Sequence, residues 1–362
     1  MRVLSLASLV AGAAAARIDT QLRTDGVPVV LQDTADLQAE FGLHSRNAVP
    51  FEPFSDEFVQ YALAKGVDWR EKGAVTPAKD QGAHGYCGTF GRTCAFEGQY
   101  AIRSGHGLRN FSEEELVECI GWTKDQFGYV AGTATTPAHG FEDMNVYPPY
   151  VESGYKDTNP PIPGHPCKWD KSKVIKGTDT GFTNVTSPAH NDEEQLAAYI
   201  FANGPVNSGV DASVFGLREK GCEAKGDCFI TTDMCKKSTK GIDHSITLVG
   251  FGTDDTNGDY WIIKNSWSTK FGTEGARLPS AFPAAPCLPC PLVCAAGPLC
   301  ALSASSHFPE PFPAAGFIKM ARGYKDEAHE TGGCAHIGCC GWVPCYGDCP
   351  PTGPDVKIPA QQ

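Results

Sequence analysis

The sequence predicts an α+β fold, and three segments carry this prediction. In residues 87–103 apolar side chains recur at helical spacing before a Ser-Gly pair, which is typical of a helix and its end. Residues 245–251 and 260–264 are short apolar runs of the kind that form buried strands. A chain of 362 residues is long enough for one large domain with a sizeable core, together with processed segments.

Composition and the first residues narrow the class of protein. A formal net charge of −12 argues against nucleic-acid binding, because a phosphate-binding surface needs an excess of Lys and Arg. Sixteen cysteines indicate an oxidising compartment. Residues 1–16 hold an apolar run that is too short to span a bilayer and ends in small residues, which predicts a cleaved signal peptide. No membrane span is expected after this signal peptide. Asn110 and Asn184 each begin a sequon for N-glycosylation.

The helix-like segment begins at Cys87, and the residues before it are unusually small. Gln81 lies six residues earlier, with Gly82, Gly85 and then Gly88 leaving this stretch nearly free of side-chain bulk. The N-terminus of a helix presents unpaired N–H groups and a partial positive charge, which favour a thiolate and can hold a developing oxyanion. The alternative for any one cysteine is a buried small hydrophobe or half of a disulfide.

His244 and Asn265 stand at the boundaries of the two strand-like runs. His244 directly precedes the first run, and Asn265 directly follows the second. Together with Cys87, they are the side chains needed to attack a carbonyl carbon. Taken alone, each has an ordinary structural alternative: a core histidine, a turn-forming asparagine and, for Gln81, a surface residue.

Several blocks of sequence resemble the papain-like cysteine peptidases, the family of the cathepsins. They follow the family's order across most of residues 67–275: VDWREKGAVTPAKDQG (67–82), the cysteine helix, SEEELVEC (112–119), GPVNSGVDA (204–212), the Asp-His pair (243–244) and WIIKNSW (261–267). The resemblance implies a two-lobed domain at 67–350, with a mainly helical lobe at about 67–170 and an antiparallel β-barrel-like lobe at about 171–350. The active-site cleft would lie between the lobes, and residues 351–362 would form a tail.

The resemblance also implies a cysteine endopeptidase that hydrolyses peptide bonds through a thioester. Cys87 would be the nucleophile and His244 the acid and base. Asn265 would orient the imidazole, and Gln81 would complete the oxyanion hole with the Cys87 N–H. No cofactor or metal is expected. The expected partners are polypeptide substrates and protein inhibitors of cysteine peptidases, and the protein is expected to be a monomer in the secretory pathway, in a lysosome or vacuole or outside the cell.

Other positions match family residues near the site. Gly209, Ile242 and Ser245 would border the pocket for the substrate residue second from the scissile bond, and their small or apolar character favours an apolar or aromatic side chain there. Trp267 would shield the Asn265–His244 pair from water, with ordinary core packing as the alternative.

Two lysines match family positions that lie near two glutamates at the lobe interface. They are Lys79 and Lys264, and the glutamates are Glu97 and Glu113. A buried Glu97 would need a cationic partner. A solvated glutamate on the face of the helix is the alternative.

Two departures from the family bear on activity. Where the family has a cysteine three residues before the nucleophile, this chain has His84, and its usual partner is missing too, whereas a Cys119–Cys167 bridge is expected to remain. Where the family has a tryptophan directly after the nucleophile, this chain has Gly88. An inactive peptidase-fold binding protein, or another acyl-transfer enzyme, therefore remains an alternative.

Residues 17–66 fall where the family carries an inhibitory propeptide, although they are shorter. The segment FEPFSDEF (51–58) could be a remnant of the part that crosses the cleft. A disordered linker is the alternative.

Residues 276–316 are dominated by Ala and Pro, and deleting them joins FGTEG to FIKMARG, as in the family. A retained intron or gene-model error is our first hypothesis, and a surface insertion is the second. A zinc site is a third, from Cys287, Cys290, Cys294 and Cys300, with or without His307. Near the end of the chain, one of Cys334, Cys339 and Cys340 is expected to bridge one of Cys222, Cys228 and Cys235.

Overall fold

The computed structural model describes residues 17–19, 22–23, 29–31, 48–82, 85–113, 123–124, 130–131, 182–185, 192–219, 222, 228–238, 241–272, 316–324, 333–337, 341–346 and 348–359. Its helices are α2 (Asp56–Lys65), α3 (Cys87–Arg103), α7 (Glu193–Asn203), α9 (Thr232–Cys235) and the 3-10 helices η2 (Ala212–Leu217) and η3 (Cys334–His336). Its strands are β1 (Arg17–Asp19), β2 (Val29–Leu31), β3 (Ala48–Val49), β4 (Val67–Asp68), β5 (Thr123–Lys124), β6 (Val130–Ala131), β7 (Phe182–Asn184), β8 (Val206–Val210), β9 (Phe229–Ile230), β10 (His244–Asp254), β11 (Gly258–Lys264), β12 (Phe317–Ala321) and β13 (Trp342–Pro344).

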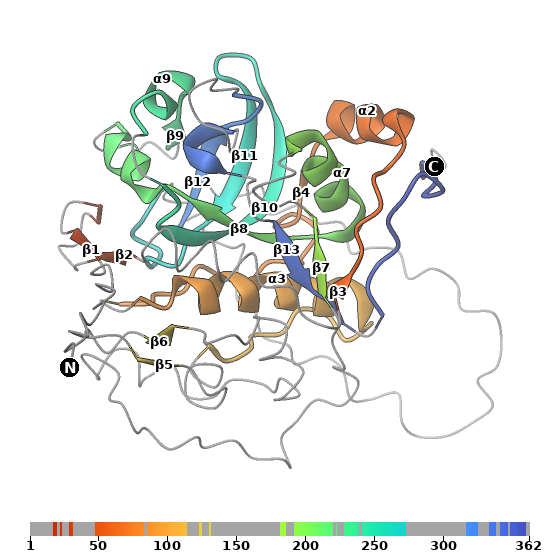
Figure 1. The fold of residues 1–362 in the computed structure, drawn as a ribbon, viewed down its shortest axis with the longest axis horizontal. Helices are drawn as coiled ribbons and strands as arrows, with labels where there is room; N and C mark the ends of the chain where they lie inside the picture. Colours follow the sequence, from red (N-terminus) through yellow and green to blue (C-terminus); the bar gives the residue numbers. More distant parts are fainter. Residues whose placement is uncertain are drawn as a thin grey trace, which may run out of the picture.

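Most of the strands join in one mixed, largely antiparallel sheet. The strand order is β3-β7-β13-β8-β10-β11-β12-β9, and β4 also pairs with β10. The long strand β10 pairs antiparallel with β8 on one side and with β11 on the other (Figure 1). The predicted α+β class is confirmed. Of residues 114–181, which belong mostly to the expected helical lobe, only the short β5–β6 pair lies within the described part.

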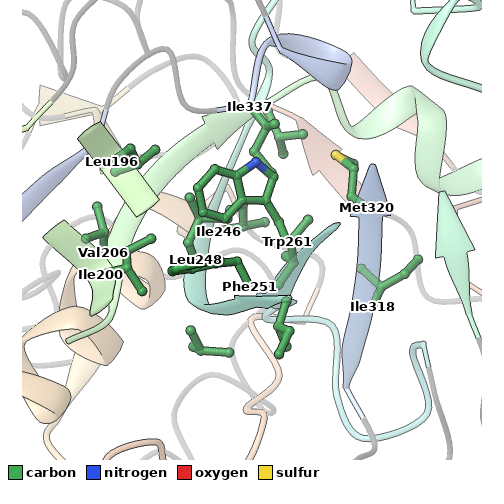
Figure 2. Close-up of a cluster of buried hydrophobic side chains, with 14 of the residues drawn as sticks. Leu196, Ile200, Val206, Ile246, Leu248, Phe251, Trp261, Ile318, Met320 and Ile337 are labelled. Carbon is green, nitrogen blue, oxygen red and sulfur yellow. The ribbon is translucent and has the colours of Figure 1, made fainter. Parts of the chain in front are cut away.

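Strand β10 separates the main hydrophobic core from helix α3. Ile246 and Leu248 point into the core with Phe251 and Trp261 (Figure 2), and all four side chains are buried. The alternate residues face the other way, because side chains in a strand alternate between its two faces. Thr247 accordingly donates a hydrogen bond of 3.1 Å from its hydroxyl to the Gly91 carbonyl of α3.

Two of the three glycines of helix α3 lie where there is no room for a side chain. A Cβ at Gly91 would come 2.0 Å from the Asn207 side-chain oxygen, and one at Gly98 would come 2.7 Å from Pro205 Cδ. The predicted helix is confirmed from Cys87 to Arg103, with Gly105 following at φ 72°. The sequence predicted an apolar stripe on one side of this helix. The structure differs, because every residue from 87 to 100 is buried.

The segment before the predicted start of the domain folds onto helix α7. The ring of Phe51 packs against Tyr199, that of Phe58 packs against Phe201, and the Phe54 N–H donates a 2.8 Å hydrogen bond to the Gln195 side chain. Helix α2 then lies beside α7, toward the end of α3 that is remote from Cys87 (Figure 1). The expectation that FEPFSDEF crosses the active-site cleft is therefore wrong.

Residues 22–23 approach the site instead. They lie between β1 and β2, which pair as a small antiparallel hairpin near the start of α3 (Figure 1). Leu22 is buried in the main hydrophobic cluster, and its carbonyl accepts a 3.3 Å hydrogen bond from Arg218. The predicted signal peptide at 1–16 lies outside the described residues.

The described residues on either side of residues 273–315 contact each other. The Gly316 N–H donates a 2.7 Å hydrogen bond to the Phe271 carbonyl, and the Gly316 carbonyl accepts one of 3.1 Å from the Asn265 N–H. Strand β12 then pairs with β11 along its whole length. Residues 273–315, with the proposed zinc ligands, lie outside the described part of the chain.

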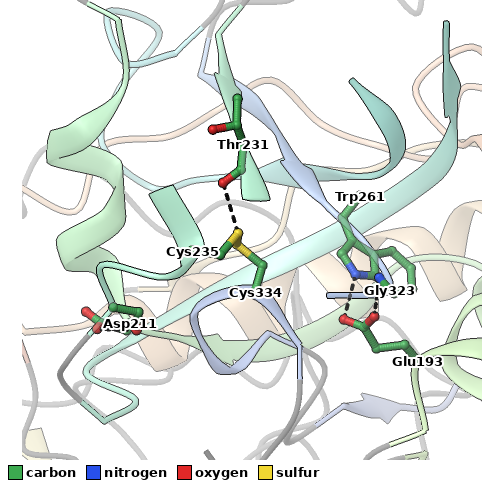
Figure 3. Close-up of a disulfide and its surroundings, with 8 residues drawn as sticks. Glu193, Asp211, Thr231, Cys235, Trp261, Gly323 and Cys334 are labelled. Carbon is green, nitrogen blue, oxygen red and sulfur yellow. Dashed lines mark hydrogen bonds between the residues drawn. A yellow bond between two sulfur atoms is a disulfide. The ribbon is translucent and has the colours of Figure 1, made fainter. Parts of the chain in front are cut away.

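A disulfide between Cys235 and Cys334 ties α9 to η3 (Figure 3). It confirms the predicted link between a cysteine ahead of His244 and one near the end of the chain. Cys222–Cys228 and Cys345–Cys349 are further bridges. The expected Cys119–Cys167 bridge falls outside the described residues.

Within the described ranges no helix is long and apolar enough to cross a membrane.

Candidate active site

Cys87 is the first residue of α3, as the sequence predicts. Its thiol is fully buried and is not part of a disulfide. The backbone amide of Ser245 forms a hydrogen bond with the sulfur. Because Ser245 directly follows His244, folding brings the nucleophile candidate to the first residues of β10, more than a hundred and fifty positions along the chain.

The side chain of Asn265 is hydrogen-bonded to the His244 ring. The distance from His244 Nε2 to Asn265 Oδ1 is 2.8 Å, and the same oxygen accepts a 2.8 Å hydrogen bond from the Ser266 N–H. An amide oxygen only accepts, so the hydrogen lies on Nε2 in the neutral ring. Among the described residues no group hydrogen-bonds to His244 Nδ1, although this nitrogen is buried. The imidazole therefore keeps a proton-accepting nitrogen inside the protein.

Aromatic rings surround this histidine. The Trp267 ring lies 4.6 Å from the His244 ring between centroids, at 31°. Phe215 meets both rings edge to face, at 6.4 Å from His244 and 5.7 Å from Trp267. The Trp267 ring thus lies against the histidine and also belongs to the hydrophobic core, which was the alternative, while its shielding role stays a prediction.

Gln81 is held beside the Asn265 segment. Its N–H donates a 2.8 Å hydrogen bond to the Ser266 carbonyl, and its side-chain oxygen accepts one from the Ser266 hydroxyl. Because that oxygen accepts, the amide nitrogen is the donor end of the side chain. Such a donor could serve a developing oxyanion, and the side chain is fully buried rather than on the surface.

Burial determines the protonation of the two reacting groups. It raises the pKa of the Cys87 thiol to about 12, and hydrogen bonds from the Ser245 and Gly88 backbone oppose this rise only in part. It also lowers the pKa of His244 to about 4, despite the hydrogen bond with Asn265. Both groups are therefore neutral at pH 7 in this closed arrangement. The expected thiolate is wrong here, because desolvation outweighs the helix N-terminus.

The residues expected to border the substrate pocket lie together but are buried. Gly209 and Ser245 are directly paired between β8 and β10, and Ile242 lies two residues before His244. The Ser245 hydroxyl donates a 2.8 Å hydrogen bond to the Asn207 side chain, so it faces α3. Ile242 and Ser245 are each 1% exposed, and Gly209 lies in a strand that is buried throughout. The expected border of the pocket is therefore covered in the intact chain.

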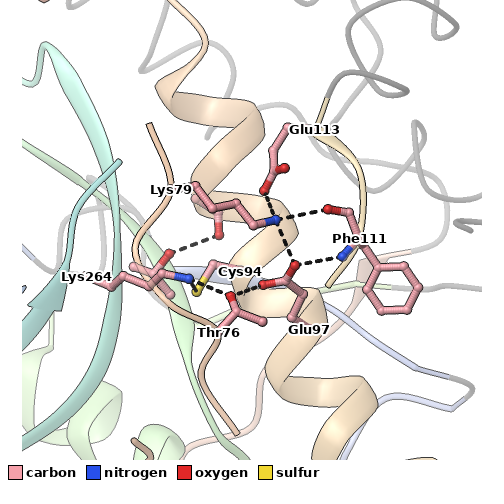
Figure 4. A network of polar contacts seen from close by, with 9 residues as sticks. Thr76, Lys79, Cys94, Glu97, Phe111, Glu113 and Lys264 are labelled. Carbon is pink, nitrogen blue, oxygen red and sulfur yellow. Dashed lines mark hydrogen bonds and ion pairs between the residues drawn. The ribbon is translucent and has the colours of Figure 1, made fainter. Parts of the chain in front are cut away.

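The predicted lysine and glutamate cluster is present (Figure 4). The Lys79 ammonium donates to Glu97 at 3.0 Å and to Glu113 at 2.6 Å. Lys264 reaches Glu97 only through the hydroxyl of Thr76, which accepts from its ammonium at 2.7 Å and donates to the Glu97 carboxylate. Glu97 is thus buried with a cationic partner, and the solvated alternative is wrong.

Sequence reasoning missed several neighbours of the site. Phe215, Ser266 and Asp80 contact its members, and Asp80 also forms an ion pair with Arg23. Ser266 and Asp80 are adjacent in sequence to Asn265 and Gln81, which is a usable signal. Nothing in the sequence marks Phe215 or Arg23. Within the described ranges no group of three or more His, Cys, Asp or Glu side chains could hold a metal ion.

Comparisons with known proteins agree with this arrangement. A family model described as papain family cysteine protease matches residues 63–277. Cathepsin L1 of Drosophila melanogaster is 35% identical over 219 residues, covering 59% of this chain and 53% of that protein. Cathepsin L of Sarcophaga peregrina is 34% identical over 225 residues, covering 59% of this chain and 58% of that protein. The chain therefore spans little more than half the length of these curated relatives.

A solved structure supports the fold. Digestive procathepsin L 3 of the Tenebrio molitor larval midgut superposes with a TM-score of 0.52 at 22% identity, covering 86% of this chain and 79% of that one. The family model spans 215 of the 362 residues and includes Cys87, His244 and Asn265. This chain belongs to the papain family of cysteine proteases.

Proposed function

We propose that this protein is a cysteine endopeptidase that acts on polypeptides in the secretory pathway. The arrangement of His244 carries the proposal. Its Nε2 is hydrogen-bonded to Asn265, and among the described residues nothing hydrogen-bonds to its Nδ1. The next residue, Ser245, contacts the Cys87 sulfur through its backbone amide. A thiol, a base and an orienting amide are the parts of an activated nucleophile. As the residue match implies, Cys87, His244 and Asn265 would take these roles.

In this mechanism the proton moves as the thiol attacks. Once a substrate enters the site, the Cys87 proton passes to His244 Nδ1 and the sulfur bonds to the peptide carbonyl carbon, whose oxygen takes the negative charge. The Asn265 oxygen stabilises the imidazolium that results. The Gln81 amide and the Cys87 N–H stabilise the oxyanion. The imidazolium then protonates the leaving amine, and a water activated by the same ring hydrolyses the thioester.

We also propose that the intact chain is latent and that part of residues 17–66 inhibits it. Supporting this, Cys87 and His244 are both 0% exposed, and Leu22 packs near the Phe215 side of the histidine. Substrate access would require these residues to move, and water would then lower the pKa of the thiol and raise that of the imidazole. Intact protein that is already as active as protein cleaved between β2 and β3 would contradict the latency.

Gly209, Ile242 and Ser245 are proposed to border an acyl-side pocket with a preference for apolar or aromatic side chains. The protein would act as a monomer without a cofactor, in a lysosome or vacuole or outside the cell, and protein inhibitors of cysteine peptidases are proposed as partners. A protein that binds peptides without turnover is the second candidate function. It is favoured by Gly88 after the nucleophile and by the complete burial of the site.

A fluorogenic peptide assay of the chain cleaved between β2 and β3, under reducing, mildly acidic conditions, separates the two functions. Cys87→Ala should abolish hydrolysis. Cys94→Ala is the matched control, because Cys94 is the other described thiol outside a disulfide, is equally buried and lies in the same helix. Hydrolysis that survives Cys87→Ala contradicts the enzyme proposal. Alkylation of Cys87 without any peptide hydrolysis favours the binding protein.

A further inference from the structure

Arg23 and Asp80 form an ion pair with two parallel hydrogen bonds. The two terminal nitrogens of the guanidinium bond separately to the two carboxylate oxygens, at 2.6 Å and 2.9 Å. The Arg23 side chain is 2% exposed and that of Asp80 is 29% exposed. Parallel N–H···O pairs of this kind recognise a guanidinium by shape as well as by charge.

Asp80 belongs to the active site rather than to a remote surface. It directly precedes Gln81, the proposed oxyanion donor, and its backbone bridges that of Trp267, whose ring packs on His244. The Gly82 N–H donates a 2.9 Å hydrogen bond to the carboxylate, which fixes its direction. The carboxylate is therefore a preformed feature of the wall beside the histidine.

The reaction decides which part of a substrate would pass this wall. His244 must deliver a proton to the leaving amine, so the leaving half of the peptide departs on the histidine side of the thiol. The Trp267 ring packs on the histidine, and Asp80 pairs through its backbone with Trp267, so we expect the leaving half to pass these two residues. The acyl half would instead meet the strand pair of Gly209 and Ser245.

Leu22, the residue before Arg23, also contacts the segment that follows Phe215. Leu22 lies against Gly216, with the closest approach to an added Cβ there at 3.3 Å, and its carbonyl accepts from Arg218. The Leu22–Arg23 pair thus joins the segment around Phe215, whose ring lies near His244, to Asp80.

From this geometry we propose that Asp80 is a specificity-determining residue that selects an arginine or lysine in the leaving half of the substrate. In the intact chain Arg23 occupies this position. The inference rests on the proposed endopeptidase function and deepens it. A guanidinium is preferred over an ammonium, because only the planar fork engages both carboxylate oxygens.

Two pairs of internally quenched peptides test the proposal in the Arg23→Gln chain after cleavage between β2 and β3. The peptides of one pair differ only in arginine or citrulline, its neutral isostere, at the first position after the scissile bond, and those of the other pair differ in the same way at the second position. The arginine peptide is expected to show a kcat/KM at least ~10-fold higher at one position. Adding Asp80→Asn should bring the ratio to about 1, while the Asn oxygen can still accept from Gly82. Asp259→Asn is the matched control, because it removes a carboxylate from a different Arg–Asp pair, with Arg322.

The ratio within one variant is the readout, so a general loss of activity does not affect it. A ratio near 1 before Asp80 is changed, or one that persists in Asp80→Asn, would overturn the proposal. The same peptides are also compared by binding to Cys87→Ala/Arg23→Gln chains with and without Asp80→Asn, by fluorescence anisotropy. If no variant cleaves any peptide after cleavage between β2 and β3, the endopeptidase function fails, and the binding ratio still decides whether Asp80 selects arginine.

Discussion

Replacing Lys79 with methionine should lower the free energy of unfolding by ~3 to 5 kcal/mol, because removing one partner of a buried ion pair leaves uncompensated charge. The Lys79 ammonium uses all three of its hydrogens, to Glu97 at 3.0 Å, to Glu113 at 2.6 Å and to the Phe111 carbonyl at 2.9 Å. The two carboxylates are 0% and 1% exposed. Methionine keeps most of the apolar stem, so the loss reports the charge and its hydrogen bonds.

The measurement is urea unfolding of the oxidised chain, followed by tryptophan fluorescence. Lys236→Met is the control, because Lys236 pairs with Asp233 in water, where the side chains are 59% and 84% exposed, and no measurable change is expected. The double variant Lys79→Met/Glu113→Gln should recover part of the loss, since one stranded carboxylate becomes neutral. A loss below ~1 kcal/mol, or a double variant less stable than the single one, would refute the reasoning.

Three further predictions concern the site, its pH dependence and the Ala/Pro-rich segment. Asn265→Ala should reduce kcat by at least ~10-fold by freeing the His244 ring, and a kcat within twofold of the unchanged enzyme would contradict its orienting role. Burial raises the pKa of Glu193 to about 7, from 4.5, although Gly323 and Trp261 donate to its carboxylate (Figure 3). The folded chain therefore binds this proton more tightly than the unfolded chain, and unfolding free energy should fall as pH rises from about 4.5 to 7, by up to ~3 kcal/mol. Glu193→Gln should flatten that slope in urea titrations at several pH values, and an unchanged slope would count against the assignment. Deleting residues 276–316 puts Gly275 in the place of Gly316, and the chain should keep its unfolding free energy within ~1 kcal/mol, because the flanks already meet. Aggregation of the shortened chain during refolding would argue that the segment is needed.

Local pattern was enough to predict the elements that carry the site. The helix from Cys87, the strand from His244 and the strand before Asn265 all follow from side-chain periodicity, which depends only on near neighbours in sequence. Family resemblance predicted the partners of Lys79 and a bridge from a cysteine ahead of His244 to one near the end of the chain, and the contacts confirm both. Which two cysteines pair, Cys235 and Cys334, came only from the structure.

Features that depend on packing of distant segments were not predicted. Arg23 and Asp80 are 57 positions apart, and nothing in either local sequence marks the pair. The neutral Cys87 thiol follows from desolvation, which is set by all the elements that cover it, whereas the helix N-terminus visible in the sequence pointed the other way. The aromatic residues of FEPFSDEF were recognised, but which apolar surface they would cover was not.

The most direct test of the pairing of Cys87 with His244 is the rate at which iodoacetamide alkylates Cys87 between pH 5 and 10, followed by mass spectrometry. With His244 acting as base, the chain cleaved between β2 and β3 should react at pH 6 to 7 at least ~10-fold faster than the His244→Ala chain cleaved in the same way, whose reaction should begin only as hydroxide removes the thiol proton. The rate at Cys94 should be the same in both chains. Equal Cys87 rates with and without the imidazole would contradict the account.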